Sequence, residues 1–373
     1  MIHKSKAFKR WILMGGVGLT VAIAAVVVLM ILSSRADRIP SLSFQECIAY
    51  STKGNKEARI SVAIIRNGKT SFACYGENGA RLPDEHDRPF EIGSLTKTMT
   101  AALIMQAQEE KLLSIDHSIG DYLDIPHLGN LPTIKQLLTH CSGYRGYYME
   151  RPMIDNFFAD RNSFVGISGQ MVLSRLDKVR LTESSYPFSY SNFGYAVLGL
   201  VLGQVYHQDY AALVNRFVQE DLGMPDTHVS NGATELPNAW GWAQTDAYRS
   251  AGALISTPRD MATYADALLR GDMVYLAEAI RPIANIRATT EKNAIMGIRM
   301  DSIGAAWIWD DVHGIVWHNG GTGHYNSYLG LDPERNIAVV VLSNLAPNDR
   351  IPATVLGVKL LLELQSQVNE PSY

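Results

Sequence analysis

The chain has 373 residues, a formal net charge of −4 at pH 7 and 19% charged residues. It contains no long basic run, so its charge gives no reason to expect a nucleic-acid partner. Its three cysteines, Cys47, Cys74 and Cys141, leave at least one thiol unpaired, and their spacing leaves open whether Cys47 and Cys74 form a disulfide.

The N-terminus combines a basic tail, residues 1–10, with an apolar segment, residues 11–32. About 20 apolar residues span a bilayer, and the basic flank stays on the cytoplasmic side. We therefore predict a single-pass membrane anchor over residues 11–32 and a linker over residues 33–42. A cleaved secretory signal is the alternative, because Ser34-Arg35-Ala36 offers small residues for cleavage. The remaining domain lies outside the cytoplasm in both cases.

The rest of the chain alternates predicted helices and strands. Residues 44–51, 98–113 and 354–367 have helical patterns. The predicted strands are residues 60–65, 70–75, 314–318, 325–331 and 337–343, with an Asn-Gly turn joining the first two. We therefore predict an α+β fold in which residues 43–128 and 245–368 form a lobe with an antiparallel five-stranded sheet flanked by helices. Residues 129–244 would form an inserted, all-helical lobe.

Ser94 and Lys97 stand three residues apart at the start of the predicted helix 98–113. On a helix this spacing places both side chains on one face, with Cβ atoms about 5–6 Å apart. Serine is a weak nucleophile until a neighbouring base activates it, and a lysine is such a base when burial disfavours its charged form. The pair is therefore a candidate nucleophile and base.

Two further motifs follow, Tyr190-Ser191-Asn192 and His318-Asn319-Gly320. Ser94 is the only serine with a lysine three residues later, and Tyr190 is the only tyrosine with an asparagine two residues later. The pattern His-x-Gly occurs at both His127 and His318. We favour His318, because it ends a predicted strand and is followed by small residues that let a substrate approach the backbone.

With these motifs, the segments Leu137–Gly143, Tyr190–Tyr195 and Ser250–Leu254 resemble signatures of class C β-lactamases, serine D,D-peptidases (penicillin-binding proteins) and related esterases. The resemblance covers roughly residues 43–364. It implies a β-lactamase/transpeptidase-like fold whose catalytic site lies in a cleft between the two lobes. It also implies that Ser94 is the acylated nucleophile, that Lys97 and Tyr190 share the proton transfers, and that no metal or organic cofactor takes part.

The resemblance also implies roles for the surrounding residues. Asn192 would hold Lys97 or a substrate amide, and His318 and Gly320 would line the opposite wall. The oxyanion hole would consist of the backbone N–H groups of Ser94 and Gly321. His318 stands where the β-lactamases usually carry lysine, and a neutral histidine attracts a carboxylate less strongly than a permanent cation does. Efficient β-lactam hydrolysis is therefore less expected.

The predicted function is that of a membrane-anchored, extracytoplasmic serine hydrolase acting on D-amino-acid peptides or esters of the cell envelope. The substrate would be a small molecule or a cell-envelope polymer, and Arg145 or Arg151 could pair with its carboxylate or phosphate. A β-lactamase and a non-catalytic penicillin-binding sensor are the alternatives on the same fold. Cys141 is a second conceivable nucleophile. The exact substrate and the oligomeric state stay open.

Overall fold

The computed structural model describes residues 39–83, 85–126, 129–232 and 236–368. The predicted basic tail and membrane anchor, residues 1–10 and 11–32, lie outside these ranges. Within the described residues, no helix combines the length and the apolar character needed to cross a membrane. The short 3-10 helix Ile39–Ser41 belongs to a separate unit from residues 44–373, which form one compact unit with the other helices and strands of the described residues.

The main sheet is entirely antiparallel, with strand order β3-β2-β1-β12-β11-β10-β9-β8-β7. Its five long strands, each of seven residues, are β1 (Ile60–Arg66), β2 (Lys69–Tyr75), β10 (Ile315–Gly321), β11 (Asn326–Asp332) and β12 (Ile337–Ser343). The short strands are β3 (Arg81–Leu82), β7 (Ala284–Asn285), β8 (Ser302–Ile303) and β9 (Ile308–Asp310).

The prediction of a five-stranded sheet is therefore wrong in number, because the described sheet has nine strands. The five predicted strands are its long members, and the four missed strands have two or three residues each. Strands this short carry no readable apolar alternation, so the pattern of the sequence cannot reveal them.

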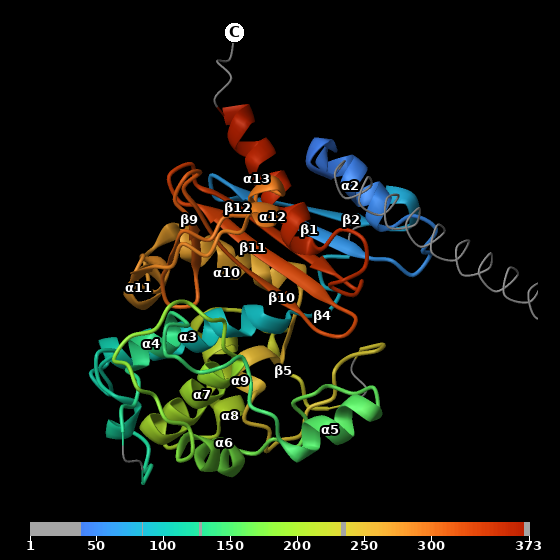
Figure 1. Ribbon diagram of the computed structural model, residues 1–373. Helices are drawn as coiled ribbons and strands as arrows, with labels where there is room; N and C mark the ends of the chain where they lie inside the picture. Colours follow the sequence, from blue (N-terminus) through green and yellow to red (C-terminus); the bar gives the residue numbers. More distant parts are fainter. Residues whose placement is uncertain (1–38, 84, 127–128, 233–235, 369–373) are drawn as a thin grey trace, which may run out of the picture. The chain divides into compact units, whose positions relative to one another are not determined.

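Helices cover both faces of the main sheet (Figure 1). Helix α13 (Ala353–Val368) packs on β11 and β12 and contacts α2 (Phe44–Ser51), whereas α10 (Pro258–Arg270) packs on β12 and β1 from the other face. Every residue of β12 is buried, as its unbroken apolar run indicates for a strand covered on both sides. On the side of α10 lies α11 (Val274–Ile280), and α12 (Glu291–Ile295) precedes β8.

A second group of helices lies beyond α10 in Figure 1. It comprises α3 (Thr96–Glu109), α4 (Ile134–Leu138), α5 (Arg151–Phe158), α6 (Gly169–Leu176), α7 (Asn192–Tyr206), α8 (Tyr210–Arg216) and α9 (Arg249–Gly252). Helix α3 packs against both α7 and α9, so it is central to this group. The division into lobes at residues 129 and 244 stays a prediction.

A small sheet with strand order β4-β6-β5 lies beside the start of α3. Its strands are β4 (Phe90–Glu91), β6 (Leu254–Ser256) and β5 (His228–Val229). The N–H of Ile92 donates to the carbonyl of Leu254, which extends the pairing up to the 3-10 turn η3 (Gly93–Leu95). This sheet thus fixes the backbone immediately before Ser94. All three cysteines are free, which answers the open question about Cys47 and Cys74.

Candidate active site

Two glycines allow the end of β10 to lie against the turn that carries Ser94. A Cβ on Gly320 would lie 1.9 Å from the carbonyl oxygen of Ile92 and 2.8 Å from the backbone nitrogen of Ser94. Gly93 has a φ of +50°, and a Cβ there would lie 2.5 Å from the nitrogen of Gly321. Side chains at these positions would push the strand and the turn apart. The structure thus brings the first and third motifs into backbone contact.

Lys97 lies in the first turn of α3 and is completely buried. Its Nζ lies 2.9 Å from Ser94 Oγ and donates to the carbonyl of Ala251 at 2.5 Å. No carboxylate among the described residues forms an ion pair with it, and burial lowers the pKa of Lys97 well below its usual 10.5. Because desolvation disfavours the ammonium form, the amine beside Ser94 is suited to accept a proton.

The aromatic ring of Tyr190 packs against the amine of Lys97. The ring centroid of Tyr190 lies 5.0 Å from Lys97 Nζ. Burial of the hydroxyl raises the pKa of Tyr190 above its usual value, and the interaction of the phenol with Ser94 opposes this rise only in part. The phenol is therefore protonated at neutral pH and is better suited to donate a proton than to act as the resting base.

Two buried histidines flank Tyr190. The ring of His140 lies 4.4 Å from that of Tyr190 between centroids, and the ring of His318 lies 6.3 Å from it. Burial and, to a lesser degree, the nearby Lys97 lower the pKa of His318 to about 3. Burial, Lys97 and His318 likewise lower the pKa of His140 well below its usual value. Both imidazoles are therefore neutral at pH 7, and the site holds no histidine cation.

His140 was not among the predicted site residues, although it lies inside the Leu137–Gly143 signature. Its Nδ1 accepts the backbone N–H of Ser191 at 3.1 Å, which joins this segment to the tyrosine motif. The Nε2 atoms of His140 and His318 are buried and have no partner within the described part of the chain. The signature itself was the available signal, but a pattern of residues does not say which side chain faces the serine.

Asn192 is the first residue of α7, directly after the N-cap Ser191, whose Oγ accepts the N–H of Gly194 at 2.9 Å. The cap fixes the direction in which the helix leaves the site. In the described residues, the side chain of Asn192 makes no hydrogen bond with Lys97, whose nitrogen is bonded to Ala251 instead. The predicted contact of Asn192 with Lys97 or with a substrate amide stays a prediction.

The hairpin of β10 and β11 sets the direction of the Gly321 N–H. The N–H of Thr322 donates to the carbonyl of Tyr325 at 2.9 Å, so Thr322 directs its backbone groups towards β11. Adjacent residues of an antiparallel strand alternate in this respect. The N–H of Gly321 therefore points away from β11, on the side where Gly93 and Ser94 lie. This direction suits the predicted oxyanion hole.

Glu91, three residues before Ser94, fastens the loop that comes after β10. It is buried and accepts the N–H of Trp240 at 2.8 Å and the hydroxyl of Thr322 at 2.6 Å. Burial raises the pKa of Glu91 to about 7, and the two hydrogen bonds oppose this rise only in part. Sequence reasoning missed this residue, because nothing in the sequence pairs it with Thr322, 231 positions later.

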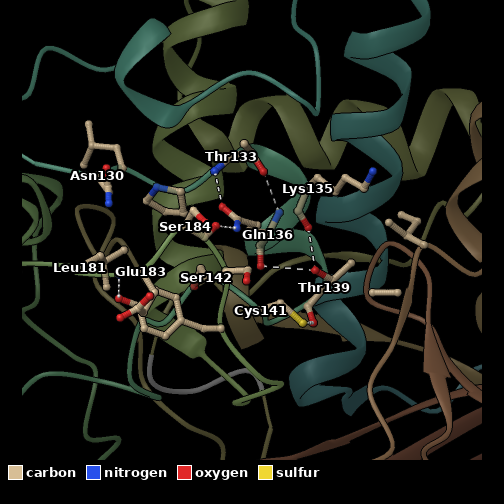
Figure 2. Close-up of a pocket in the computed structure, with 16 residues that line it drawn as sticks. Asn130, Thr133, Lys135, Gln136, Thr139, Cys141, Ser142, Leu181, Glu183 and Ser184 are labelled. Carbon is tan, nitrogen blue, oxygen red and sulfur yellow. Dashed lines mark hydrogen bonds between the residues drawn. The ribbon is translucent and has the colours of Figure 1, made fainter.

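A cavity of about 510 Å³ is lined in part by the segment 139–142 (Figure 2). Thr139, Cys141 and Ser142 line it, whereas His140 faces the catalytic residues. Ser94, Lys97 and Tyr190 are absent from its wall. This cavity is therefore separate from the candidate active site. Among the described residues, no group of three or more His, Cys, Asp or Glu side chains could hold a metal ion.

Comparison with known proteins identifies the family to which the sequence is similar. Residues 44–360 match a protein family described as Beta-lactamase. The chain is 24% identical over 349 residues to the D-alanyl-D-alanine-carboxypeptidase/endopeptidase AmpH of Escherichia coli (strain K12), covering 85% of this chain and 87% of that protein.

Two solved structures are similar in fold. The first is a beta-lactamase/D-alanine carboxypeptidase from Yersinia pestis complexed with citrate, with a TM-score of 0.70, 19% identity, and coverage of 90% of this chain and 99% of that one. The second is an octameric penicillin-binding protein homologue from Pyrococcus abyssi, with a TM-score of 0.68, 23% identity, and coverage of 86% and 75%. The predicted β-lactamase/transpeptidase-like fold is confirmed.

Proposed function

This chain belongs to the beta-lactamase family, whose members are serine hydrolases, and we propose that it cleaves D-amino-acid peptides or esters of the cell envelope through an acyl-enzyme on Ser94. One observation carries the proposal: the buried amine of Lys97 lies 2.9 Å from Ser94 Oγ and has no counter-ion among the described residues. A neutral amine at this distance is a general base within reach of the serine proton.

The reaction would proceed in two halves. The Ser94 hydroxyl gives its proton to Lys97 Nζ while Oγ attacks the substrate carbonyl carbon, and the oxyanion is held by the N–H groups of Ser94 and Gly321. The bond to the leaving amine or alcohol then breaks, and the leaving group takes a proton from Tyr190 or Lys97. Water attacks the resulting ester, gives its proton to the same pair, and releases the acid and the Ser94 hydroxyl.

The proposed substrate class is supported by the relatives and by His318. AmpH and the Yersinia pestis protein carry D-alanine carboxypeptidase in their names. The pKa of His318 is lowered to about 3, so the third motif offers no cation where many β-lactamases have a lysine. This favours peptide or ester cleavage over efficient β-lactam hydrolysis.

We further propose that the enzyme works outside the cytoplasm, held at the membrane by residues 11–32. The support is the length of this apolar segment and the basic tail before it. If the segment is cleaved, the same domain would be secreted.

The test compares an acyl-D-alanyl-D-alanine peptide with the matching D-alanyl-D-lactate ester, using the wild-type chain and Ser94→Ala. We expect turnover of at least one compound by the wild type and none by the variant. Equal turnover by the variant would contradict the proposal. Turnover of a penicillin alone would identify a β-lactamase, and a penicillin adduct that never clears would identify a non-catalytic sensor.

A further inference from the structure

An apolar cavity of about 440 Å³ lies beside helix α5. It is lined by Tyr147, Met149, Met153, Ile154, Phe157, Ser163 and Phe164. Ser163 and the hydroxyl of Tyr147 supply the only polar side-chain groups among these residues, and none of them carries a charge. Small-molecule sites have about this size, roughly 300–1,000 Å³, and this kind of apolar lining. The cavity is therefore large enough to take an apolar group.

One wall of this cavity is fastened to the tyrosine motif of the active site. The hydroxyl of Ser191 donates to the carbonyl of Arg145 at 2.7 Å, and the N–H of Phe193 donates to the carbonyl of Gly146 at 3.0 Å. The next residue, Tyr147, lines the cavity. The segment that borders the tyrosine motif thus continues directly into the cavity wall.

The opposite wall of the cavity is connected through aromatic rings to the loop that follows Gly321. A Cβ on Gly323, two residues beyond Gly321, would lie 2.9 Å from Trp240 Nε1. The ring of Trp240 lies 6.3 Å from that of Phe164, which in turn lies 6.4 Å from the ring of Tyr147. Phe164 and Tyr147 both line the cavity. Packed aromatic side chains therefore connect the loop after Gly321 with the wall of the same cavity.

We propose that this cavity is an acyl-chain subsite, which takes a straight alkyl chain on the acyl side of the bond that Ser94 attacks. The proposal rests on the proposed acyl-enzyme on Ser94, and it adds esters with an alkyl acyl group to the substrates of that site. An alkyl chain gains free energy from each methylene that leaves water and needs no hydrogen-bond partner, which fits an uncharged, apolar lining. The cavity wall is joined both to the tyrosine motif and to the loop after Gly321, and this proximity favours a chain carried by the substrate of Ser94 over a separate ligand.

Two adjacent phenylalanines at the end of α5 make the test selective. Phe157 is 76% exposed and lines the cavity, whereas Phe158 is 83% exposed and does not. An aspartate at either position would face solvent in large part, so we expect the fold to tolerate it. Only the aspartate at position 157 would place a charge at the apolar wall, so Phe158→Asp is the matched control.

The experiment measures kcat/KM of the full-length chain for p-nitrophenyl esters from acetate to octanoate, each below the concentration at which it aggregates. We expect kcat/KM to rise about two- to fourfold for each added methylene. Phe157→Asp should lower the octanoate-to-acetate ratio about tenfold, and Phe158→Asp should change it less than about twofold. Met149→Asp, at another exposed lining position, repeats the test if Phe157→Asp fails to fold.

A wild-type kcat/KM that does not rise with acyl-chain length would overturn the proposal. An octanoate-to-acetate ratio that falls equally in both phenylalanine variants would also overturn it. Equal loss would indicate that the exposed surface of α5 acts as a whole, as in contact with a lipid layer. If the wild type cleaves no ester, the proposed function fails separately, and calorimetric titration of Ser94→Ala with decanoate then tests the cavity alone. Saturable binding that Phe157→Asp weakens at least tenfold, and Phe158→Asp does not, would support the subsite; absence of binding would refute it.

Discussion

The segment 139–142 borders both the catalytic centre, through His140, and the cavity of Figure 2, through Thr139, Cys141 and Ser142. The two regions differ in the solvent exposure of their ionisable side chains. On the catalytic side, Lys97 is fully buried and has no carboxylate partner among the described residues. On the other side, the side chain of Lys135 is 44% exposed and lies 3.5 Å from a carboxylate oxygen of Asp116. Both regions contain a lysine near serines and threonines, but only one lysine is desolvated.

This difference shows that burial without a counter-ion, rather than a supply of polar groups, makes a reactive amine. A lysine in water keeps its proton at neutral pH, whereas desolvation favours the neutral form, which can accept a proton. His140 and His318 show the same effect of burial, because both imidazoles are desolvated and neutral at pH 7. The cavity of Figure 2 has no buried lysine of this kind in its wall.

The largest expected effect comes from replacing each lysine in turn. Lys97→Met keeps most of the apolar stem and removes the amine, so we expect kcat/KM to fall by about 10⁴-fold or more, as when a catalytic base is lost. Lys135→Met should change kcat/KM less than about twofold. Steady-state kinetics on the same ester would check both variants. If Lys97→Met kept a tenth of the activity, the amine could not be the base.

Two tyrosines, one in each region, test the same difference between the catalytic centre and the cavity of Figure 2. Tyr190→Phe removes a hydroxyl that faces Ser94, and we expect kcat/KM to fall by about 10²–10⁴-fold, the usual contribution of a positioned acid or base. Tyr186→Phe removes a hydroxyl at the cavity of Figure 2 and should leave kcat/KM within about twofold. Equal effects of the two substitutions on the same substrate would show that Tyr190 takes no part in proton transfer.

Glu91 and Glu183 extend the comparison to stability. Burial raises the pKa of Glu91 from 4.5 to about 7, so the folded state holds this proton more tightly than the unfolded state. The free energy of unfolding should therefore decrease as the pH rises from about 4.5 to 7, by about 3 kcal/mol from this group alone. Glu91→Gln should abolish this part of the decrease, and Glu183→Gln, at the exposed cavity, should not.

Urea unfolding of the wild type and both variants at pH 4.5, 6 and 8 provides the measurement. The unfolding free energy of the wild type should fall relative to that of Glu91→Gln between pH 4.5 and about 7 and then level off. A difference that is independent of pH would mean that folding does not raise the pKa of Glu91.

The smallest expected effect concerns charge next to the catalytic side. Arg145 contributes its backbone carbonyl to the bond with Ser191, so its side chain starts beside the tyrosine motif. Arg145→Ala, alone or with Arg151→Ala, should raise the KM of a peptide with a free terminal carboxylate about two- to fivefold, as expected for an exposed ion pair. The KM of the amide-capped peptide serves as the control. A KM that changes equally for both peptides would exclude carboxylate pairing.

Local pattern predicted the long elements well. The predicted helix 44–51 and strand 337–343 coincide with α2 and β12, because each has a clear apolar pattern and a turn at its boundary. The three motifs were predicted to share one site, and the structure brings Ser94, Lys97, Tyr190 and His318 together. Lys97 lies in the first turn of α3, as its place in the motif predicted, whereas Ser94 lies in the 3-10 turn η3 directly before that helix.

What the sequence did not reveal depends on contacts between distant segments. The short strands β4, β5 and β6 carry no periodic signal, yet they position Glu91 and the turn before Ser94. The bond from Lys97 to Ala251 joins residues 154 positions apart through a backbone carbonyl, which any residue type can supply. The burial that lowers the pKa of Lys97 is likewise a property of the packed fold.

The central claim is that the buried amine of Lys97 activates Ser94, and acylation at pH 7 tests it most directly. Intact mass spectrometry of the full-length chain after exposure to a penicillin should show one adduct on the wild type. The same adduct should be absent from Ser94→Ala and should form at least about 10³-fold more slowly on Lys97→Met. An adduct on Ser94→Ala would place the nucleophile elsewhere, with Cys141 as the first candidate, and unchanged acylation of Lys97→Met would contradict the account.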